Sequence, residues 1–556
     1  MPTFAAIDIG SNSCRLKIAK VVAHQLKTVH EDREVTRLGA SVFESGMISP
    51  ESMAATLLAL KRFQRAVQLH GVEQIRVVAT SAMRDARNSA AFQAWVKAET
   101  GWNLEIISGL EEGRLIHLGV MGVSAAATEP GAEPGAGGRV LLVDLGGGSC
   151  EITLSERKHI KETVSLPLGA VRLSEEFVTS DPAPAEGLAR MRRFIARELR
   201  QVRQRLQPES VSLVIATSGT AAALSEAVTT LATGESAKPA KLPGKSKKKS
   251  AGKSAAKAIG KPVLSLTVSH TLATSQATTS ASAREVHKLA VRLAQLPLAE
   301  RAAIPGIGPR RAEIIVAGSA VYDELLENFE LPGIRYSPRG LRDGILAQML
   351  AEQDARASAH REFEHDRWES VLATAQRYGV ELRHAEPVRA HAVQLFRDLK
   401  ALHQLPPEYE NWLAAAAVLA DTGKFINHQG HHRHTQYIIS SSEIYGYTPL
   451  QRTLVSAIAR YLGKSRPQPG DRALRNIPPI EHQNVHRAVV LLRLAVALNQ
   501  DRASDVLRVR AKLYPKRVYL ELEPGRTGAE LELWSLRKEA DYFLEVFGRE
   551  LFCTLA

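Results

Sequence analysis

The chain has 556 residues, enough for roughly three or four domains of ordinary size. Hydrophobic residues make up 44% and charged residues 24%, which is typical of a globular protein and excludes a chain that is disordered as a whole. The three cysteines, Cys14, Cys150 and Cys553, are too few for a disulfide framework or for a structural zinc site made of cysteine alone.

Two features of the sequence indicate where in the cell the protein is expected. The longest apolar run, WLAAAAVLA from Trp412 to Ala420, ends on Asp421 and is far shorter than the roughly 20 residues that cross a bilayer. The N-terminus MPTFAAIDIG has no basic region and reaches an acidic residue at Asp8, which argues against a signal peptide. We therefore expect a cytoplasmic protein with reduced cysteines.

The net charge of +13 indicates a polyanionic partner, but the excess is unevenly distributed. Nine lysines and no acid lie between Lys238 and Lys261, and without them the charge is 13 − 9 = +4. This segment consists mainly of Lys, Ser, Ala, Gly and Pro, so it lacks the side chains that build a core. We predict a disordered insertion over residues 236–262.

The first part of the chain alternates strand-like and helical patterns. Residues 1–128 contain the strand-like runs TFAAIDIG, IRVVATS and LEIIS, separated by helical stretches such as PESMAATLLALKRFQRAVQLH and SAAFQAWVKAETG. The alternation returns over residues 139–350, with VLLVDLG, CEITLS, SLVIATSG and the helical RRAEIIVAGSAVYDELLENF. Both segments are predicted to be α/β domains.

The patterns then change twice. Residues 351–507 are rich in Leu, Ala and Arg and predict a helical domain. Residues 508–556 begin with RVRAKLYPKRVYLELEPG, whose alternation continues into AELELWS and predicts a small β-containing domain.

A duplicated element connects the two α/β segments. AAIDIGSNSCRLKI, which starts at Ala5, aligns without gaps with LLVDLGGGSCEITL, which starts at Leu141. Each copy is an apolar strand that ends in Asp, a turn of small residues and a second strand. The turn residues are candidate phosphate ligands through their backbone N–H groups, because small side chains and glycines at positive φ let a phosphate approach: Gly10, Ser11, Asn12 and Ser13, and Gly146, Gly147, Gly148 and Ser149.

The acids of the two copies are candidate metal ligands. Asp8 and Asp144 are expected at facing strand ends, where carboxylates suit the mostly water-mediated binding of Mg²⁺ to phosphates. For either Asp alone, a turn cap is an equally good interpretation, and the duplication favours the metal site.

A set of motifs resembles the exopolyphosphatase/guanosine pentaphosphate phosphohydrolase family in order and spacing: DIGSNSCRL, ATSAMRDARN, ISGLEEGRLIHLGV, VDLGGGSCEI, LPLGAVRL, ATSGT, IPGIGPRRAEIIVAG and YSPRGLRDGIL. The resemblance is specific from residue 1 to about 350 and looser beyond. It implies two ribonuclease H-like lobes of the actin/hexokinase/Hsp70-like superfamily, with an active cleft between them. The duplication agrees with this fold.

The resemblance also implies roles for individual residues. Glu112 in GLEEGR matches the general base that activates a water, and Glu151 matches a second essential acid near the metal. Arg84 in SAMRDA matches a phosphate contact. Arg37 and Arg172 lie in motifs that face the same cleft in relatives.

Two choices stay open among these motifs. Glu111 competes with Glu112, but adjacent helical residues point about 100° apart, so only one of them is expected to face the cleft. The turn Ser218, Gly219 and Thr220 corresponds to an adenosine site in nucleotide-binding members of the superfamily, and here it is interpreted as bracing the second lobe.

The helical region resembles an HD-type phosphohydrolase domain that has lost a ligand. Ala420 stands beside Asp421 where a histidine is required, which leaves His391, Asp421 and Asp501. A further cluster, His428, His431, His432 and His434, has spacing that suggests zinc, but we interpret it as structure and an anion-binding surface. We expect no metal-dependent phosphohydrolase activity from this region.

The sequence therefore predicts a Mg²⁺-dependent exopolyphosphatase that removes terminal phosphate from inorganic polyphosphate, with a homodimer implied by the long relatives. The alternatives are a guanosine pentaphosphate (pppGpp) 5′-phosphohydrolase, a kinase of the same superfamily and a non-catalytic polyphosphate-binding protein. The lysine-rich insertion favours a long polyanion as substrate, and nucleic acid is another acidic partner for it.

A first prediction concerns residues 236–262. Each lysine that contacts polyphosphate should release condensed counterions, as at a nucleic-acid backbone, and make binding depend on salt. Replacing the segment with a neutral Gly/Ser loop of equal length should weaken binding of long polyphosphate and flatten its salt dependence. Hydrolysis of very short substrates should be unchanged. Unaltered long-chain affinity and salt slope would show that the lysines do not serve this substrate.

Overall fold

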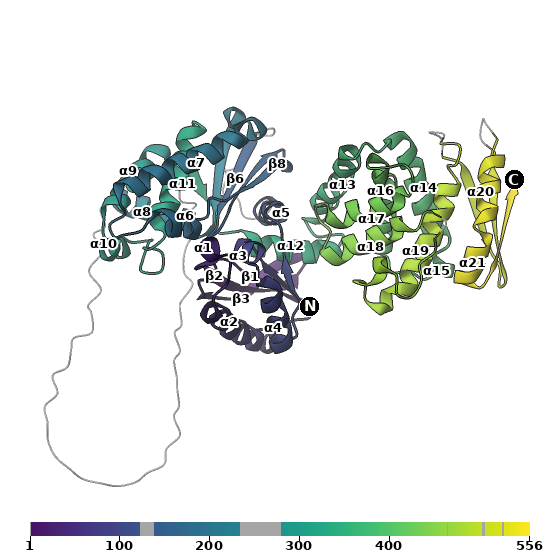
Figure 1. The fold of residues 1–556 in the computed structure, drawn as a ribbon, viewed down its shortest axis with the longest axis horizontal. Helices are drawn as coiled ribbons and strands as arrows, with labels where there is room; N and C mark the ends of the chain where they lie inside the picture. Colours follow the sequence, from purple (N-terminus) through teal and green to yellow (C-terminus); the bar gives the residue numbers. More distant parts are fainter. Residues whose placement is uncertain (1, 123–137, 234–279, 464, 503–505, 525–527) are drawn as a thin grey trace, which may run out of the picture. The chain divides into compact units, whose positions relative to one another are not determined.

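A computed structural model describes residues 2–122, 138–233, 280–463, 465–502, 506–524 and 528–556 (Figure 1). The predicted insertion at residues 236–262 lies outside these ranges. The chain forms two compact units. One contains the described residues up to 122 with Glu151–Ser165 and Arg339–Ala556, and the other contains residues 138–150 with Leu166–Pro338.

The first sheet has five strands in the order β3-β2-β1-β4-β5. The central strand β1 is antiparallel to β2 and parallel to β4, so its last residues lie at the same edge as the end of β4. Its strands are β1 (Thr3–Ile9), β2 (Ser13–Val22), β3 (Gln25–Val35), β4 (Gln74–Ala79) and β5 (Leu104–Ile106). Its helices are α1 (Val42–Ser45), α2 (Pro50–Leu69), α3 (Ser81–Asp85), α4 (Ser89–Thr100) and α5 (Gly109–Met121).

The second sheet has the order β10-β11-β9-β6-β7-β8, and its run β8-β7-β6-β9-β11 repeats the topology of the first sheet. Its strands are β6 (Arg139–Leu145), β7 (Cys150–Glu156), β8 (His159–Leu166), β9 (Val211–Thr217), β10 (Ser280–Ser282) and β11 (Gly333–Tyr336). The accompanying helices are α6 (Ala170–Phe177), α7 (Ala185–Leu206), α8 (Ser218–Thr233), α9 (Ala283–Gln295), α10 (Leu298–Ala303) and α11 (Ile315–Asn328). The predicted α/β class with two related ribonuclease H-like lobes is confirmed.

The duplicated turns share one backbone hydrogen bond. The amide of Gly10 donates to the carbonyl of Ser13 at 3.1 Å, and that of Gly146 donates to the carbonyl of Ser149 at 3.0 Å. Neither of these glycines has a positive φ, so conformational freedom is not what selects them. Close approach is the better reason, because a Cβ on Gly10 would lie 3.2 Å from the carbonyl oxygen of Ser13, and one on Gly146 would lie 3.3 Å from that of Ser149.

Helix α12 (Leu341–Gln353) packs on α5 and β1 of the first unit. A Cβ on Gly344 would lie 1.7 Å from the carbonyl oxygen of Leu115, and one on Gly119 would lie 2.5 Å from the amide nitrogen of Gly344. The two helix backbones therefore touch at glycines. The sequence predicts that residues up to 350, which include most of α12, belong to the second lobe. This contact instead places α12 with the first unit.

The region after α12 is helical, as predicted, and ends in a three-stranded sheet of order β12-β13-β14. Its helices are α13 (His360–Arg377), α14 (Leu382–Asp398), α15 (Lys400–His403), α16 (Tyr409–Leu419), α17 (His431–Ser441), α18 (Pro449–Arg460) and α19 (Pro479–Ala497). The tail contains β12 (Arg508–Leu513), β13 (Arg517–Glu523), α20 (Glu530–Lys538), α21 (Ala540–Phe547) and β14 (Glu550–Leu555).

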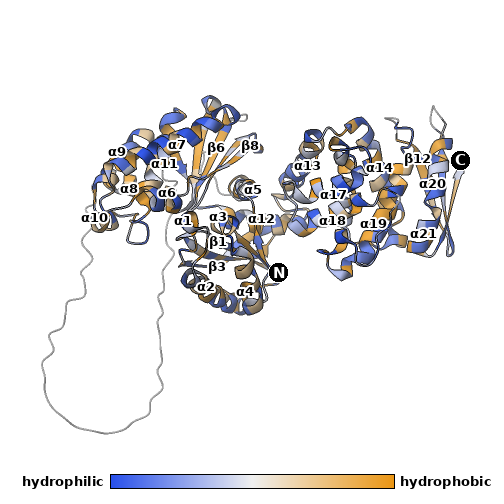
Figure 2. Ribbon diagram, in the orientation of Figure 1, coloured by the Kyte–Doolittle hydropathy of each residue, from blue (hydrophilic) through white to orange (hydrophobic). Residues whose placement is uncertain are grey.

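The tail differs from expectation in two respects. AELELWS begins helix α20, whose acidic first turn and basic last turn complement the helix dipole. The tail also has no core of its own, because Val518, Leu520 and Leu522 belong to the same hydrophobic cluster as helices α14, α16 and α19. Hydrophobic residues follow the strands and the inner faces of the helices (Figure 2).

Cys14, Cys150 and Cys553 are buried, in keeping with a packing role. No helix in the described part of the chain has both the length and the apolar character required to cross a membrane.

Candidate active site

The first unit brings together one arginine and two glutamates, here called the Arg84 cluster: Arg84, Glu112 and Glu151. Nη1 of Arg84 donates to Oε2 of Glu112 at 2.9 Å and to the carbonyl oxygen of Ile107 at 2.9 Å. Nη2 of Arg84 lies 3.8 Å from Oε1 of Glu151. These residues are far apart in sequence, so the fold assembles the three side chains that the motifs singled out.

The cluster is largely shielded from water. The side chain of Glu151 is 1% exposed, that of Glu112 is 9% exposed and that of Arg84 is 20% exposed. Burial alone would lower the pKa of Arg84, but the charges of Glu112 and Glu151 outweigh burial and raise this pKa. The guanidinium is therefore held in its charged form between the two carboxylates.

Local sequence explains the position of Glu112. Ser108 caps α5 by accepting a hydrogen bond from the amide of Glu111 at 3.1 Å, so the helix begins directly after β5 and Ile107. Glu112 then lies in the first helical turn, next to the carbonyl of Ile107 that also holds Arg84.

Glu151 is held by a residue that the sequence analysis did not identify. Oγ of Ser165, near the end of β8, donates to Oε1 of Glu151 at 2.8 Å. A Cβ on Gly109 would lie 2.1 Å from this Oγ, so the first residue of α5 must be glycine for the serine to fit. The sequence contains one signal that could have identified Ser165, which is its position directly before the LPLGAVRL motif.

Glu111 lies in a different environment from Glu112. Its two carboxylate oxygens each accept a hydrogen bond from Arg114 at 2.8 Å. Burial would raise the pKa of Glu111, but the charges of Arg114 and Arg76 lower it below its usual value. The carboxylate of Glu111 is thus held in a bidentate ion pair with Arg114, which supports the choice of Glu112 as the general base.

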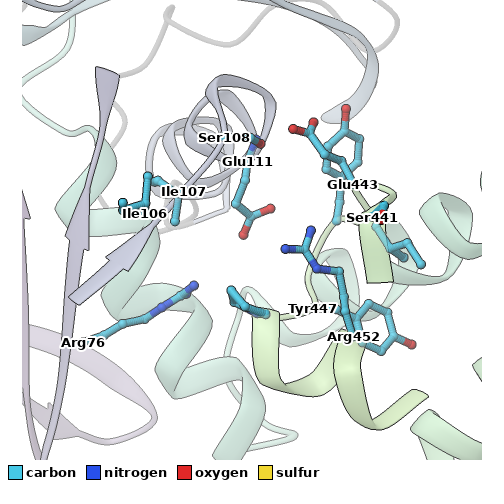
Figure 3. A pocket seen from close by; sticks show the side chains of 12 residues that line it. Arg76, Ile106, Ile107, Ser108, Glu111, Ser441, Glu443, Tyr447 and Arg452 are labelled. Carbon is cyan, nitrogen blue, oxygen red and sulfur yellow. The ribbon is translucent and has the colours of Figure 1, made fainter. Parts of the chain in front are cut away.

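Glu111 also lines a cavity of about 210 Å³ between the β5–α5 segment and residues 441–452. Figure 3 shows its carboxylate between the guanidinium groups of Arg76 and Arg452. Arg76 is additionally paired with Glu105 at 3.0 Å. The cavity therefore lies between helix α5 and the helical region. It is lined by Glu111 rather than by Glu112.

The predicted phosphate and metal ligands divide between the units. Asp8 and the turn from Gly10 to Ser13 lie in the first unit, with Asp144 and the turn from Gly146 to Ser149 in the second. Each unit presents the same element, Asp at the end of a central strand followed by the turn. The facing arrangement of Asp8 and Asp144 stays a prediction.

Asp8 has the properties of a cation ligand. Burial raises the pKa of its carboxyl group, and the nearby Arg15 and Arg342 only partly offset this effect. A bound divalent cation would stabilise the ionised form. The carboxylate oxygens of Asp8, Asp144 and Glu151 are the type of donor that Mg²⁺ prefers, and their role as magnesium ligands stays a prediction.

Other candidates have structural contacts. Nε of Arg172 donates to the carbonyl of Gly148 at 2.8 Å, so this arginine braces the second turn. Ser218 begins α8 rather than a turn, with φ of 71°, and its Oγ donates to the carbonyl of Leu145 at 2.6 Å. This contact agrees with a bracing role.

The HD-like region shows Asp421 in an ion pair with Lys424 at 2.5 Å. His391 is fully buried, and burial lowers its pKa to about 4. His384, not His391, shares a cavity with Asp421. Among the described residues no three metal-binding side chains converge at Asp421. The absence of phosphohydrolase activity from this region stays a prediction.

The two-lobed fold and the paired acids are suited to phosphoryl-transfer chemistry. Residues 17–353 match the Ppx/GppA phosphatase family, and residues 367–540 match domain III of Ppx/GppA phosphatases. The chain belongs to the Ppx/GppA phosphatase family.

Two solved structures are similar to this chain. An exopolyphosphatase from Cytophaga hutchinsonii is 24% identical with a TM-score of 0.51, over 63% of this chain and 99% of that protein. A Ppx/GppA family member from Aquifex aeolicus is 28% identical with a TM-score of 0.47, over 64% of this chain and 99% of that protein. The first likeness supports the fold.

We expect Glu112→Gln to keep the fold and phosphate binding but to lose most turnover. The amide preserves the shape of the side chain and removes its capacity to accept a proton, which typically costs about 10²–10⁴-fold in rate. Orthophosphate release measures the effect. Glu111→Gln is the matched control on the same helix, and an active Glu112→Gln beside an inactive Glu111→Gln would show that the wrong acid was chosen.

Ser165 is expected to be a positioning residue. Ser165→Ala should lower kcat by about tenfold with little change in KM, because Glu151 loses one hydrogen bond while the substrate contacts remain. Ser155→Ala, which removes a buried hydroxyl that bonds to His117 from the neighbouring strand, is the control for a general loss of packing. Equal effects of the two variants on kcat, or a purely KM effect of Ser165→Ala, would contradict this role.

Proposed function

We propose that this protein is an exopolyphosphatase that hydrolyses the terminal phosphoanhydride bond of inorganic polyphosphate. The observation that carries the proposal is the Arg84 cluster, in which a buried arginine holds two buried glutamates from different elements. Hydrolysis of a phosphoanhydride requires a positioned water, a carboxylate to orient it and cations to offset phosphate charge.

In this proposal Glu112 accepts a proton from a water whose oxygen attacks the terminal phosphorus. The new P–O bond forms as the anhydride P–O bond breaks, and the shortened chain leaves as a phosphate anion. Arg84 fixes the direction of the Glu112 carboxylate by donating to its Oε2. The positive charge of the Arg84 guanidinium would also attract the oxygens of the terminal phosphate.

The remaining chain of phosphates is proposed to bind at the two duplicated turns. Their amide groups supply fixed partial positive charge without a bulky side chain in the way. Mg²⁺, held by Asp8, Asp144 and Glu151, would supply charge neutralisation of the phosphate oxygens when bound. Asp8, Asp144 and Glu151 bring negative charge to the site and no phosphate-binding cation. A metal ion is therefore required if a polyanionic substrate is to bind beside them.

The substrate is the open choice, because polyphosphate and pppGpp both end in a terminal phosphoanhydride. The lysine-rich sequence at residues 236–262 favours the longer polyanion. The proposal is tested by measuring orthophosphate release from long polyphosphate, short polyphosphate and pppGpp side by side, with Mg²⁺ present and with Glu112→Gln as the inactive control.

We expect the highest kcat/KM for long polyphosphate and the loss of all three activities in Glu112→Gln. A higher kcat/KM for pppGpp would reassign the protein as a pppGpp phosphohydrolase with the same cluster. No release from any of the three substrates would overturn the proposal.

A further inference from the structure

A second cluster of polar side chains lies away from the Arg84 cluster, where the β7–β8 hairpin meets helix α13. His159 is the first residue of β8, and His365 and Asp366 are adjacent on α13. One ligand atom from each of these residues lies within 4.8 Å of the other two. In the described part of the chain these three side chains are the one such group.

The distances are close to those of a metal centre. Nδ1 of His159 lies 3.7 Å from Oδ1 of Asp366, and the two imidazole rings are 4.5 Å apart between centroids, edge to face. Ligands at about 2.0–2.2 Å from a tetrahedral zinc ion are roughly 3.4 Å apart. The separation of His159 Nδ1 from Asp366 Oδ1 is close to this value, and the third donor lies within 4.8 Å of both.

The ligand atoms of these side chains are also available to bind a metal ion. Nδ1 of His159 is buried and makes no hydrogen bond, although the side chain as a whole is 44% exposed. Its contact with Asp366 at 3.7 Å is too long for a hydrogen bond, so a bound cation would satisfy this buried nitrogen better. The side chain of Asp366 is only 11% exposed, and its nearest ion-pair partner is this same histidine.

A fourth candidate ligand, the second with an oxygen donor, lies on the same helix as His365 and Asp366. Glu362 is one helical turn before Asp366, on the same face of α13. Its Oε1 is buried and has no hydrogen-bond partner. Two imidazoles with one or two carboxylates suit zinc and related transition metals, whereas Mg²⁺ prefers oxygen donors alone.

We propose that His159, His365 and Asp366, with Glu362 as a fourth ligand, form a zinc site that fastens the β7–β8 hairpin to helix α13. This site is separate from the proposed magnesium ligands. Its role follows from its position, because the same hairpin carries Glu151 and Ser165 of the catalytic group. A metal here would stabilise the hairpin against the helical region without contacting the substrate.

The test uses the full-length chain, freed of metal with a chelator and then kept in excess Mg²⁺. Zn²⁺ is titrated by calorimetry, and Co²⁺ is titrated as a spectroscopic probe whose visible absorption reports tetrahedral nitrogen and oxygen ligands. The variants are His159→Ala, His365→Ala and Asp366→Asn. The matched control is His428→Ala, which removes an exposed histidine from the other histidine-rich segment.

We expect one equivalent of Zn²⁺ to bind in the presence of Mg²⁺ and to raise the unfolding temperature, as binding to the native state requires. Each of the three variants should weaken Zn²⁺ binding by at least about tenfold and abolish the Co²⁺ absorption, whereas His428→Ala should match the unaltered protein. The proposal is overturned if no Zn²⁺ binds, if His159→Ala and His365→Ala bind it normally, or if His428→Ala loses it equally.

Discussion

The contact between Arg84 and the two acids, Glu112 and Glu151, is the constraint on which the rest of the site depends. Two carboxylates that are almost fully shielded from water would repel one another and favour protonation. The positive charge of Arg84 offsets the negative charge of these acids, and its bond to the carbonyl of Ile107 fixes its own position. The two helices and the hairpin that supply these residues, α3, α5 and β7–β8, must therefore be held close together.

Glycines allow these elements to pack this closely. Gly109 lets α5 lie against Ser165, and Gly119 and Gly344 let α5 lie against α12. The catalytic helix is thus held on two faces by backbone contacts that a larger side chain would prevent. On a third face Glu111 and Arg114 form a bidentate pair next to the cavity of Figure 3, so the helical region is in contact with the helix that carries the proposed base.

The fold and much of the site could be predicted from the sequence, because apolar strands and duplicated turns leave a strong local pattern. The duplication around Asp8 and Asp144 predicted two related sheets, and the order of strands confirms them. Long-range packing left no such pattern. The attachment of α12 to the first unit depends on Gly344 meeting Leu115 across more than 200 residues, and the alternation in AELELWS was overridden by helix-forming residues and end charges.

The residues that were missed have the same explanation. Ser165 is recognised as part of the site only when β8 places it beside Glu151, and His159 is recognised as a donor only when α13 brings His365 and Asp366 to it. The choice between Glu111 and Glu112 depended on helical geometry and the family resemblance, and the ion pairs now support that choice independently.

The central claim, that Arg84 acts through Glu112 as one unit, is tested most directly by a double-mutant cycle on kcat/KM. Arg84→Ala, Glu112→Gln and the double variant would be compared with the unaltered protein, and circular dichroism would confirm that each is folded. If the two residues form one unit, the double variant should lose no more than about threefold beyond the more damaging single variant. Losses that multiply in the double variant would show that the two residues act independently and would contradict the account.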